Sequence, residues 1–314
     1  MAENSSSKVG KVLAVTAGVT LAVGATYCAS CAYIFTKVFK RKKNPSYLEF
    51  SNSLITKKEN DAWFENADKS IVEIVSYDGL RLSGTLVNNN SDKYVIVFHA
   101  YDFFGAQVLD VPKHFYDEGY NCLIVDQRGY GLSEGDYTTL GWKEHYDCID
   151  WIDFIIKQNQ NAKIVLHGTS LGATAVLNAT GEFLPSNVVC AISDCAFTSI
   201  DSLLKYQIKR FLKVPLGALV PGVNILCKSK MNFNLYEANT LRQVKQSSTP
   251  TLFLHGELDC FAPFEMVFDL FYACTAEKEL CTFQESKHAE SFLDHKYFEK
   301  VFEFINLHIN KNEN

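Results

Sequence analysis

The chain has 314 residues, of which 47% are hydrophobic and 21% are charged. This composition is typical of a globular protein and excludes a disordered, collagenous or coiled-coil chain. The formal net charge is −6, from 30 basic and 36 acidic residues. A mildly acidic chain is a poor candidate for the basic surface that nucleic-acid-binding proteins use. We therefore expect no nucleic-acid partner.

An uncharged run near the N-terminus, Val12–Phe35, predicts a membrane anchor. As a helix, its roughly 24 residues would extend for about 36 Å, which is enough to cross a bilayer core of ~30 Å. Lys8 and Lys11 precede the run, and five basic residues follow it within Lys37–Lys43. We predict a single transmembrane span, within an anchor and basic flank at residues 1–43. The alternative is a cleaved signal peptide, which has the same order of basic and apolar residues.

The same region indicates which side of the membrane the main domain occupies. Positive charge prefers the cytoplasmic side, and more basic residues follow the run than precede it. The ten cysteines are scattered, and the C-x-x-C pair Cys28 and Cys31 lies inside the apolar run without a second pair. We therefore expect free thiols in a reducing compartment rather than disulfides or a zinc site. Both observations favour a cytoplasmic main domain.

Residues 44–70 are polar and mixed, and we interpret them as a linker and a helix that leads into the main domain. Two runs with alternating apolar residues follow, Ile71–Val75 and Leu80–Val87, on either side of Asp78-Gly79. An Asp-Gly pair between such runs is typical of a β-hairpin. The main domain, at residues 71–314, is therefore expected to begin with an antiparallel hairpin.

Beyond the hairpin, short and fully apolar runs alternate with segments of helical periodicity. This alternation predicts an α/β fold, with a mostly parallel sheet covered by helices on both faces. The predicted strands after the hairpin are Tyr94–His99, Asn121–Asp126, Lys163–His167, Val188–Ser193, Thr251–His255 and Leu280–Phe283.

About 50 residues between Cys195 and Ser248 lack a clear strand. They carry apolar residues at helical spacing within Leu203–Leu212, followed by a break at Pro215–Pro221. A long segment of this kind inside a compact domain is usually functional. We predict a small helical cap, at about residues 197–246, over the C-terminal edge of the sheet.

Gly168, Ser170 and Gly172 form a G-x-S-x-G pattern between a predicted strand and a predicted helix, which is typical of a nucleophile elbow. The turn exposes the hydroxyl above the sheet, and the helix N-terminus favours developing negative charge. A Cβ atom at either glycine would collide with the neighbouring strand or helix. We predict Ser170 as the nucleophile. The plainer interpretation is a glycine-tight turn without a catalytic role.

A serine hydroxyl is a weak nucleophile and needs a neighbouring base. In this type of fold the order along the chain is serine, acid, histidine. Among eight histidines, His288 follows a strand end, precedes the final helix and lies downstream of a suitable acid. We predict His288 as the base and Asp259, four residues after a strand end, as the acid that orients it. Asp194, at the end of the preceding strand, is the alternative acid.

Acyl transfer also needs backbone N–H donors for the oxyanion. Leu171, directly after the nucleophile, and Tyr101, in the loop after Tyr94–His99, are predicted to supply them. The turn Asp126–Gly131 follows another strand and is expected to support that loop. Arg128 in this turn is also considered as a clamp for the substrate.

Five stretches carry more specific motifs: Gly129–Asp136, Gly141–Trp142, His167–Ala173, Ser193–Ser199 and His255–Asp259. Together they resemble the α/β-hydrolase superfamily. More narrowly, they are similar to membrane-anchored bacterial members grouped with serine aminopeptidase-like and bud-emergence-like proteins. The resemblance covers about residue 71 to the C-terminus. It implies an eight-stranded sheet, a triad of Ser170, Asp259 and His288, and no cofactor.

The sequence departs from the family pattern at two places. Members usually have His-Gly where this chain has His99-Ala100, so the extra methyl group is expected to narrow or reposition the oxyanion loop. After the acid, Cys260–Pro263 replaces a more usual apolar-Val-Pro sequence. Neither departure removes a triad residue.

These observations predict a serine hydrolase that cleaves ester-type acyl substrates without a metal or cofactor. Serine peptidase and thioesterase activities stay open, as does a non-enzymatic scaffold or receptor, because one fold supports several functions. An aminopeptidase must pair its substrate's ammonium group with carboxylates. The cap segment Ser199–Met231 has one acid, Asp201, and six basic residues. A small-molecule or lipid-like acyl ester is therefore the expected substrate.

Overall fold

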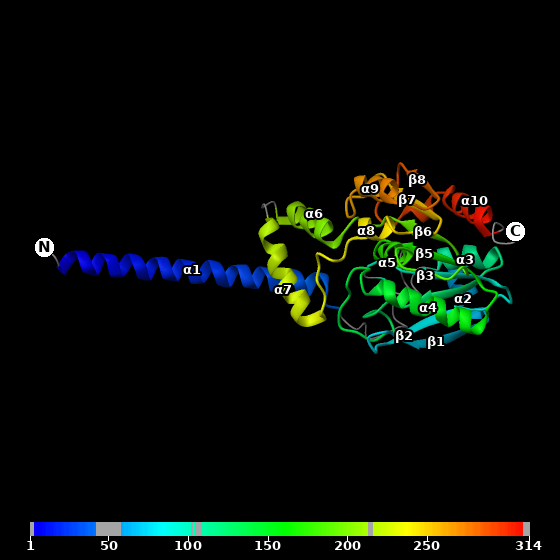
Figure 1. Ribbon diagram of the computed structural model, residues 1–314, viewed down its shortest axis with the longest axis horizontal. Helices are drawn as coiled ribbons and strands as arrows, with labels where there is room; N and C mark the ends of the chain where they lie inside the picture. The colour runs from blue at the N-terminus through cyan, green and yellow to red at the C-terminus, as the bar shows by residue number, and fades with distance from the viewer. Residues whose placement is uncertain (1–2, 42–57, 102, 104–108, 213–215, 310–314) are drawn as a thin grey trace.

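The structure is a computed structural model that describes residues 3–41, 58–101, 103, 109–212 and 216–309. It has a layered α/β body from which one long helix, α1 (Glu3–Val38), projects (Figure 1). The helix that leads into the sheet is α2 (Lys58–Asn66). Most of the predicted linker, up to residue 57, lies outside the described residues.

An eight-stranded sheet forms the centre of the body, in the order β1-β2-β4-β3-β5-β6-β7-β8. β2 pairs with β1 and β4 in antiparallel fashion, and all other neighbours are parallel. The prediction of a mostly parallel, eight-stranded sheet is therefore confirmed. The strands are β1 (Lys69–Val75), β2 (Arg81–Val87), β3 (Lys93–Phe98), β4 (Asn121–Val125), β5 (Lys163–Thr169), β6 (Val188–Asp194), β7 (Thr251–Gly256) and β8 (Lys278–Phe283).

Helices cover both faces of the sheet (Figure 1). On one face, α3 and α10 pack against Val97 and Ile124. On the other face, α4 and α5 pack against Ile96 and Leu123. Because consecutive strand residues point to opposite faces, a strand covered on both faces must be apolar throughout. The helices of the body are α3 (Asp110–Asp117), α4 (Glu144–Gln158), α5 (Leu171–Thr180), α8 (Thr240–Val244), α9 (Glu265–Ala273) and α10 (Tyr297–Ile309).

Two cap helices, α6 (Ile200–Leu212) and α7 (Leu219–Met231), lie between β6 and α8 in the chain, within the segment predicted to form the cap. α7 lies across α1 where that helix meets the body (Figure 1). The two helices approach closely at Gly222, where a Cβ atom would lie 2.5 Å from Cys31 Sγ. The cap and the end of α1 thus form one apolar cluster, which includes Phe35 and Leu204.

The stretch Thr20–Val38 of α1 is long and apolar enough to cross a membrane, although a signal sequence would meet the same criteria. Residues 21–29 are exposed, whereas Cys31, Ile34 and Phe35 are buried among the cap side chains. The helix therefore has an apolar part outside the body and an apolar end packed into it.

Candidate active site

Ser170 lies at the turn between β5 and α5, at the C-terminal edge of the sheet. Its φ of 56° and ψ of −111° are unusual for a residue with a side chain, and such conformations gather at functional sites. Its N–H donates to the carbonyl of Asp194 (2.7 Å), and its carbonyl accepts from the N–H of Thr174 (2.9 Å). Strand β6 and the first turn of α5 therefore hold the elbow in place.

Close backbone contacts require both glycines of the elbow. A Cβ atom at Gly168 would overlap the carbonyl of Gly172, and a Cβ atom at Gly172 would overlap the carbonyl of Phe98 on β3. Because glycine has no Cβ atom, α5 can start directly against β3 and β5.

The predicted nucleophile, base and acid lie in one hydrogen-bonded row. Ser170 Oγ is 2.7 Å from His288 Nε2, and His288 Nδ1 is 2.6 Å from Asp259 Oδ2. The three side chains come from the elbow, the loop after β8 and the loop after β7. Both distances are within the range needed for proton transfer from a nucleophile to an oriented base.

Hydrogen bonds fix the carboxylate of Asp259 on both oxygens. Oδ1 accepts from the N–H groups of Phe261 (2.8 Å) and Ala262 (3.0 Å), and a second histidine, His255, places Nε2 3.2 Å from Oδ2. Burial raises the pKa of Asp259, but hydrogen bonds from His255 and His288 outweigh it and lower the pKa to about 2. The carboxylate is therefore ionised at neutral pH. The sequence did not reveal the His255 contact, although the two residues lie only four positions apart.

Asp194 lies beside this row rather than in it. Its Oδ1 accepts from Ser291 Oγ (2.9 Å), and its backbone carbonyl accepts from the N–H of Ser170. Burial raises the pKa of its carboxyl group to about 6. The geometry therefore favours Asp259 over Asp194 as the partner of His288.

The two residues predicted to supply the oxyanion donors, Leu171 and Tyr101, line the same cavity as Ser170. Leu171 is the first residue of α5, so its N–H is among the donors that have no partner within the helix. Tyr101 follows β3 and lines the same cavity as the nucleophile. Gln127 braces this loop, because its N–H donates to His99 Nε2 (3.1 Å) and its side-chain amide donates to the His99 carbonyl (2.6 Å). Burial lowers the pKa of His99 to about 4, so a neutral imidazole accepts at Nε2 and donates from Nδ1 to the carbonyl of Ala100 (2.8 Å).

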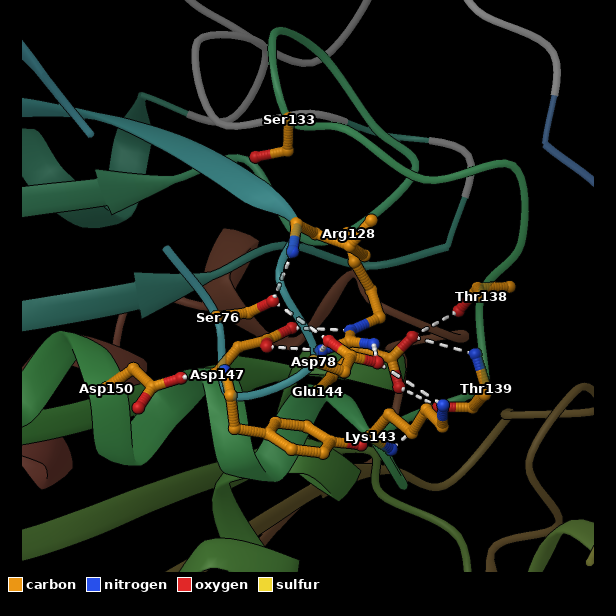
Figure 2. Close-up of polar contacts among 12 residues, drawn as sticks. Ser76, Asp78, Arg128, Ser133, Thr138, Thr139, Lys143, Glu144, Asp147 and Asp150 are labelled. Carbon is orange, nitrogen blue, oxygen red and sulfur yellow. Dashed lines mark hydrogen bonds and ion pairs between the residues drawn. The ribbon is translucent and has the colours of Figure 1, made fainter. Parts of the chain in front are cut away.

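Arg128 is held by two carboxylates (Figure 2). Its guanidinium is 3% exposed and donates to Asp147 (2.5 and 2.7 Å) and to Asp78 (2.9 and 3.1 Å). Burial raises the pKa of Asp78, but hydrogen bonds from Arg128 outweigh it and lower the pKa to about 2. Arg128 thus joins its own turn to the hairpin turn and to α4. This geometry supports the structural interpretation of the turn rather than a substrate clamp.

A cluster of potential metal ligands includes two residues of this row, Asp259 and His288. Sγ of Cys195 and donor atoms of Asp259 and His288 lie within 4.8 Å of one another. Burial, reinforced by the charges of Asp194 and Asp259, raises the pKa of the Cys195 thiol well above its usual range. Because a metal ion binds the thiolate, this donor set suits proton transfer better than metal binding. That the site works without a metal or cofactor stays a prediction.

A cavity of about 910 Å³ lies beside Ser170, and this size is typical of small-molecule sites. Most of its lining side chains are apolar, and they come from α6, from the last turns of α1 and from loops of the body. None of the described residues that line it is acidic. The sequence did not predict the contribution of α1, because an uncharged run shows no pattern that marks one face as a pocket wall.

The chain is similar to several known proteins. The family model of the alpha/beta hydrolase fold matches residues 99–248. The esterase Pf2001 of Pyrococcus furiosus aligns with a TM-score of 0.67 and 22% sequence identity, over 87% of this chain and 98% of the esterase.

Two yeast proteins are similar over most of their length. Protein bem46 of Schizosaccharomyces pombe is 24% identical over 248 residues, which cover 76% of this chain and 77% of bem46. The uncharacterized membrane protein YNL320W of Saccharomyces cerevisiae is 24% identical over 238 residues, which cover 74% of this chain and 78% of that protein. These similarities agree with the bud-emergence-like resemblance of the sequence motifs.

Proposed function

Because the chain belongs to the α/β-hydrolase superfamily, we propose that it is a serine hydrolase that cleaves acyl esters through an acyl-enzyme on Ser170. The observation that carries this proposal is the hydrogen-bonded row of Ser170, His288 and Asp259 at the edge of an apolar cavity. The fold similarity to an esterase is consistent with it.

In the first half of the proposed reaction, Ser170 Oγ attacks the ester carbonyl carbon while His288 Nε2 takes the hydroxyl proton. The carbonyl oxygen becomes an oxyanion, to which the N–H groups of Leu171 and Tyr101 donate. Asp259 accepts the hydrogen bond from His288 Nδ1 and stabilises the imidazolium. The ester C–O bond then breaks, and His288 gives its proton to the leaving alcohol.

The second half releases the acyl group. His288 takes a proton from a water molecule, which attacks the acyl carbon and forms a new C–O bond. The bond between the acyl carbon and Ser170 Oγ breaks, and the proton returns to Oγ. The net reaction converts one ester and one water into one acid and one alcohol.

The lining of the cavity supports an ester rather than a peptide substrate. An aminopeptidase must desolvate a substrate ammonium group, and such a buried charge needs a carboxylate partner. No described residue of the lining supplies one. A neutral acyl ester with an apolar chain matches the same surface without an unpaired charge.

The N-terminal helix supports a membrane location. Thr20–Val38 meets the length and composition requirements of a span, and the similar protein YNL320W is named a membrane protein. The basic residues at 37–43 favour a cytoplasmic catalytic domain. We therefore include a single-pass anchor with this orientation in the proposal.

A fluorophosphonate probe tests the nucleophile directly. The detergent-solubilised full chain should be labelled at one serine, and Ser170→Ala should abolish the labelling. Ser202→Ala, on cap helix α6 where Ser202 Oγ contacts Ser199 Oγ, provides a matched control that should be labelled normally. Labelling that survives Ser170→Ala would reject the nucleophile, and a folded wild-type protein that is never labelled would favour a scaffold or receptor.

The substrate class is tested with p-nitrophenyl esters and thioesters of several chain lengths beside aminoacyl-naphthylamides. We expect the esters to be cleaved fastest, with turnover that depends on Ser170. Faster cleavage of the naphthylamides would indicate a peptidase, and faster cleavage of the thioesters would indicate a thioesterase.

A further inference from the structure

The helix that contains the candidate membrane span also contributes a wall to the cavity beside Ser170. Thr26, Ala29, Tyr33 and Lys37 line this cavity at spacings of three or four residues, which place them on one face of α1. From Thr26 to the end of α1 is about 12 residues, or about 18 Å of helix. The cavity therefore follows α1 for several turns.

The C-terminal end of α1 is joined to the predicted oxyanion loop. The Tyr101 hydroxyl donates to the carbonyl oxygens of Lys37 (3.0 Å) and Val38 (2.9 Å). The Arg41 guanidinium lies 4.1 Å from the centroid of the Tyr101 ring and donates to the Val38 carbonyl (3.1 Å). These bonds satisfy carbonyl groups that a helix end leaves without partners. The Ser170 end of the cavity is therefore at the C-terminal end of α1, and the cavity extends from there toward the N-terminus of the helix.

The cavity extends toward the exposed part of the candidate membrane span. Residues 21–29 of α1 are exposed and apolar, and α1 leaves the body beside α6 and α7 (Figure 1). These cap helices expose Phe211 (72%) and Ile225 (67%) and also carry Lys209 and Lys228. Exposed apolar side chains among basic residues suit an anionic membrane surface. A bilayer that surrounds α1 would therefore meet the cap at the far end of the cavity.

We propose that α1 is one wall of an acyl-chain pocket, and that the substrate is a long-chain acyl ester of a membrane lipid, which reaches Ser170 from the bilayer along α1. This inference rests on the proposed serine hydrolase function and names its substrate class. The ester carbonyl lies at Ser170, and the acyl chain follows α1 toward Thr26. The anchor thus has a second role, as a part of the substrate site.

The proposal predicts a steep dependence on acyl-chain length. Each methylene group that moves from water into an apolar pocket favours binding by about three- to fourfold. Chains that extend along α1 toward Thr26 bury more methylene groups than chains that end near Ser170. The full chain should therefore prefer palmitoyl over butyryl esters by well over tenfold in kcat/KM.

Two tryptophan substitutions on α1 separate a pocket role from an anchoring role. Ala29 is exposed on α1 and lines the cavity, whereas Ala32 is exposed on α1 and is not among the lining residues. Ala29→Trp places an indole in the path of the acyl chain, and Ala32→Trp makes the same change away from it. In detergent micelles, we expect Ala29→Trp to lower the ratio of 4-methylumbelliferyl palmitate to butyrate hydrolysis at least tenfold. Ala32→Trp should change this ratio less than twofold.

A third variant shows the direction of the chain. Thr26 lines the cavity about one turn further from Ser170 than Ala29. Thr26→Trp should therefore reduce hydrolysis of the palmitoyl ester while the lauroyl ester is affected less, and Ala29→Trp should reduce both. The extent of fluorophosphonate labelling and the thermal midpoint report whether each variant is folded.

The outcomes distinguish this inference from the proposed function. Ser170-dependent hydrolysis with the expected loss in Ala29→Trp supports both. Ser170-dependent hydrolysis that prefers butyrate, or that is changed equally by Ala29→Trp and Ala32→Trp, overturns the inference and leaves the serine hydrolase in place. If Ala29→Trp is not folded, an unchanged chain-length profile in folded Thr26→Trp overturns the inference. Absence of any Ser170-dependent ester hydrolysis overturns both.

Discussion

Replacing Asp259 by asparagine should lower kcat/KM for p-nitrophenyl esters by about 10³- to 10⁴-fold while the fold is kept. The substitution is nearly isosteric, and the amide oxygen can occupy the Oδ1 position, where it accepts from the N–H groups of Phe261 and Ala262. The amide NH₂ group then occupies the Oδ2 position, 2.6 Å from His288 Nδ1. His288 must accept at Nδ1 and carry its proton on Nε2, so it cannot take the proton of Ser170.

The size of the effect follows from this change of tautomer. A loss of 10³- to 10⁴-fold corresponds to about 4–5 kcal/mol of transition-state stabilisation. Asp194 provides the matched control, because its carboxylate contacts Ser291 Oγ and is not hydrogen-bonded to His288. Asp194→Asn should therefore leave kcat/KM within about threefold of the wild-type value.

Steady-state ester hydrolysis and the rate of fluorophosphonate labelling together provide the assay. Both should fall in Asp259→Asn and stay near the wild-type values in Asp194→Asn, with similar circular dichroism for all three proteins. Turnover that survives Asp259→Asn and is lost in folded Asp194→Asn would refute the assignment of the acid.

Three further predictions concern stability and location. Arg128→Met should destabilise the protein by about 3–5 kcal/mol in urea at pH 7.5, because it leaves Asp147 buried without its cation, and adding Asp147→Asn should restore part of the loss. A folded Arg128→Met protein with normal stability but no turnover would instead indicate a substrate clamp. The native pKa of Asp194, about 6, lies above its ordinary value of 3.8, so the native state binds the extra proton and wild-type stability falls as pH rises from about 4 to 6. This loss of stability is about 3 kcal/mol, and Asp194→Asn should remove it. The substitution should therefore raise the thermal midpoint more at pH 7.5 than at pH 4.5. An equal effect at both pH values would contradict the raised pKa of Asp194. After an alkaline carbonate wash the full chain should stay with the membranes, and release or a mature N-terminus near Cys31 would show that the segment is a processed signal.

Features that depend on local chain geometry could be predicted from the sequence. A strand covered on both faces must be apolar throughout, so the runs at β3 to β7 predicted a parallel sheet with helices on both sides. The pattern around Ser170 was equally informative, because only glycine avoids backbone overlap at Gly168 and Gly172. These signals lie within a few residues of one another in the chain.

Features that depend on distant segments were decided by the tertiary structure. The sequence offered both Asp194 and Asp259 as acids, and only the packed loops after β7 and β8 bring one of them to His288. The sequence also did not predict that Asp78 and Asp147 are the partners of Arg128, because the hairpin turn and α4 lie 50 and 19 residues away in the chain.

For α1, the sequence predicted the membrane span but not the contacts with the cap and the cavity. Its length and lack of charge predicted a membrane span, since a bilayer selects only for apolar length. Which face of the helix would line a cavity depends on the packing of Cys31 and Phe35 against the cap and on the bonds from Tyr101 to the helix end. Hydrophobic packing is non-directional, so the shape of the folded body determines which face of an apolar helix is buried and against which residues. No local pattern in the sequence predicts this.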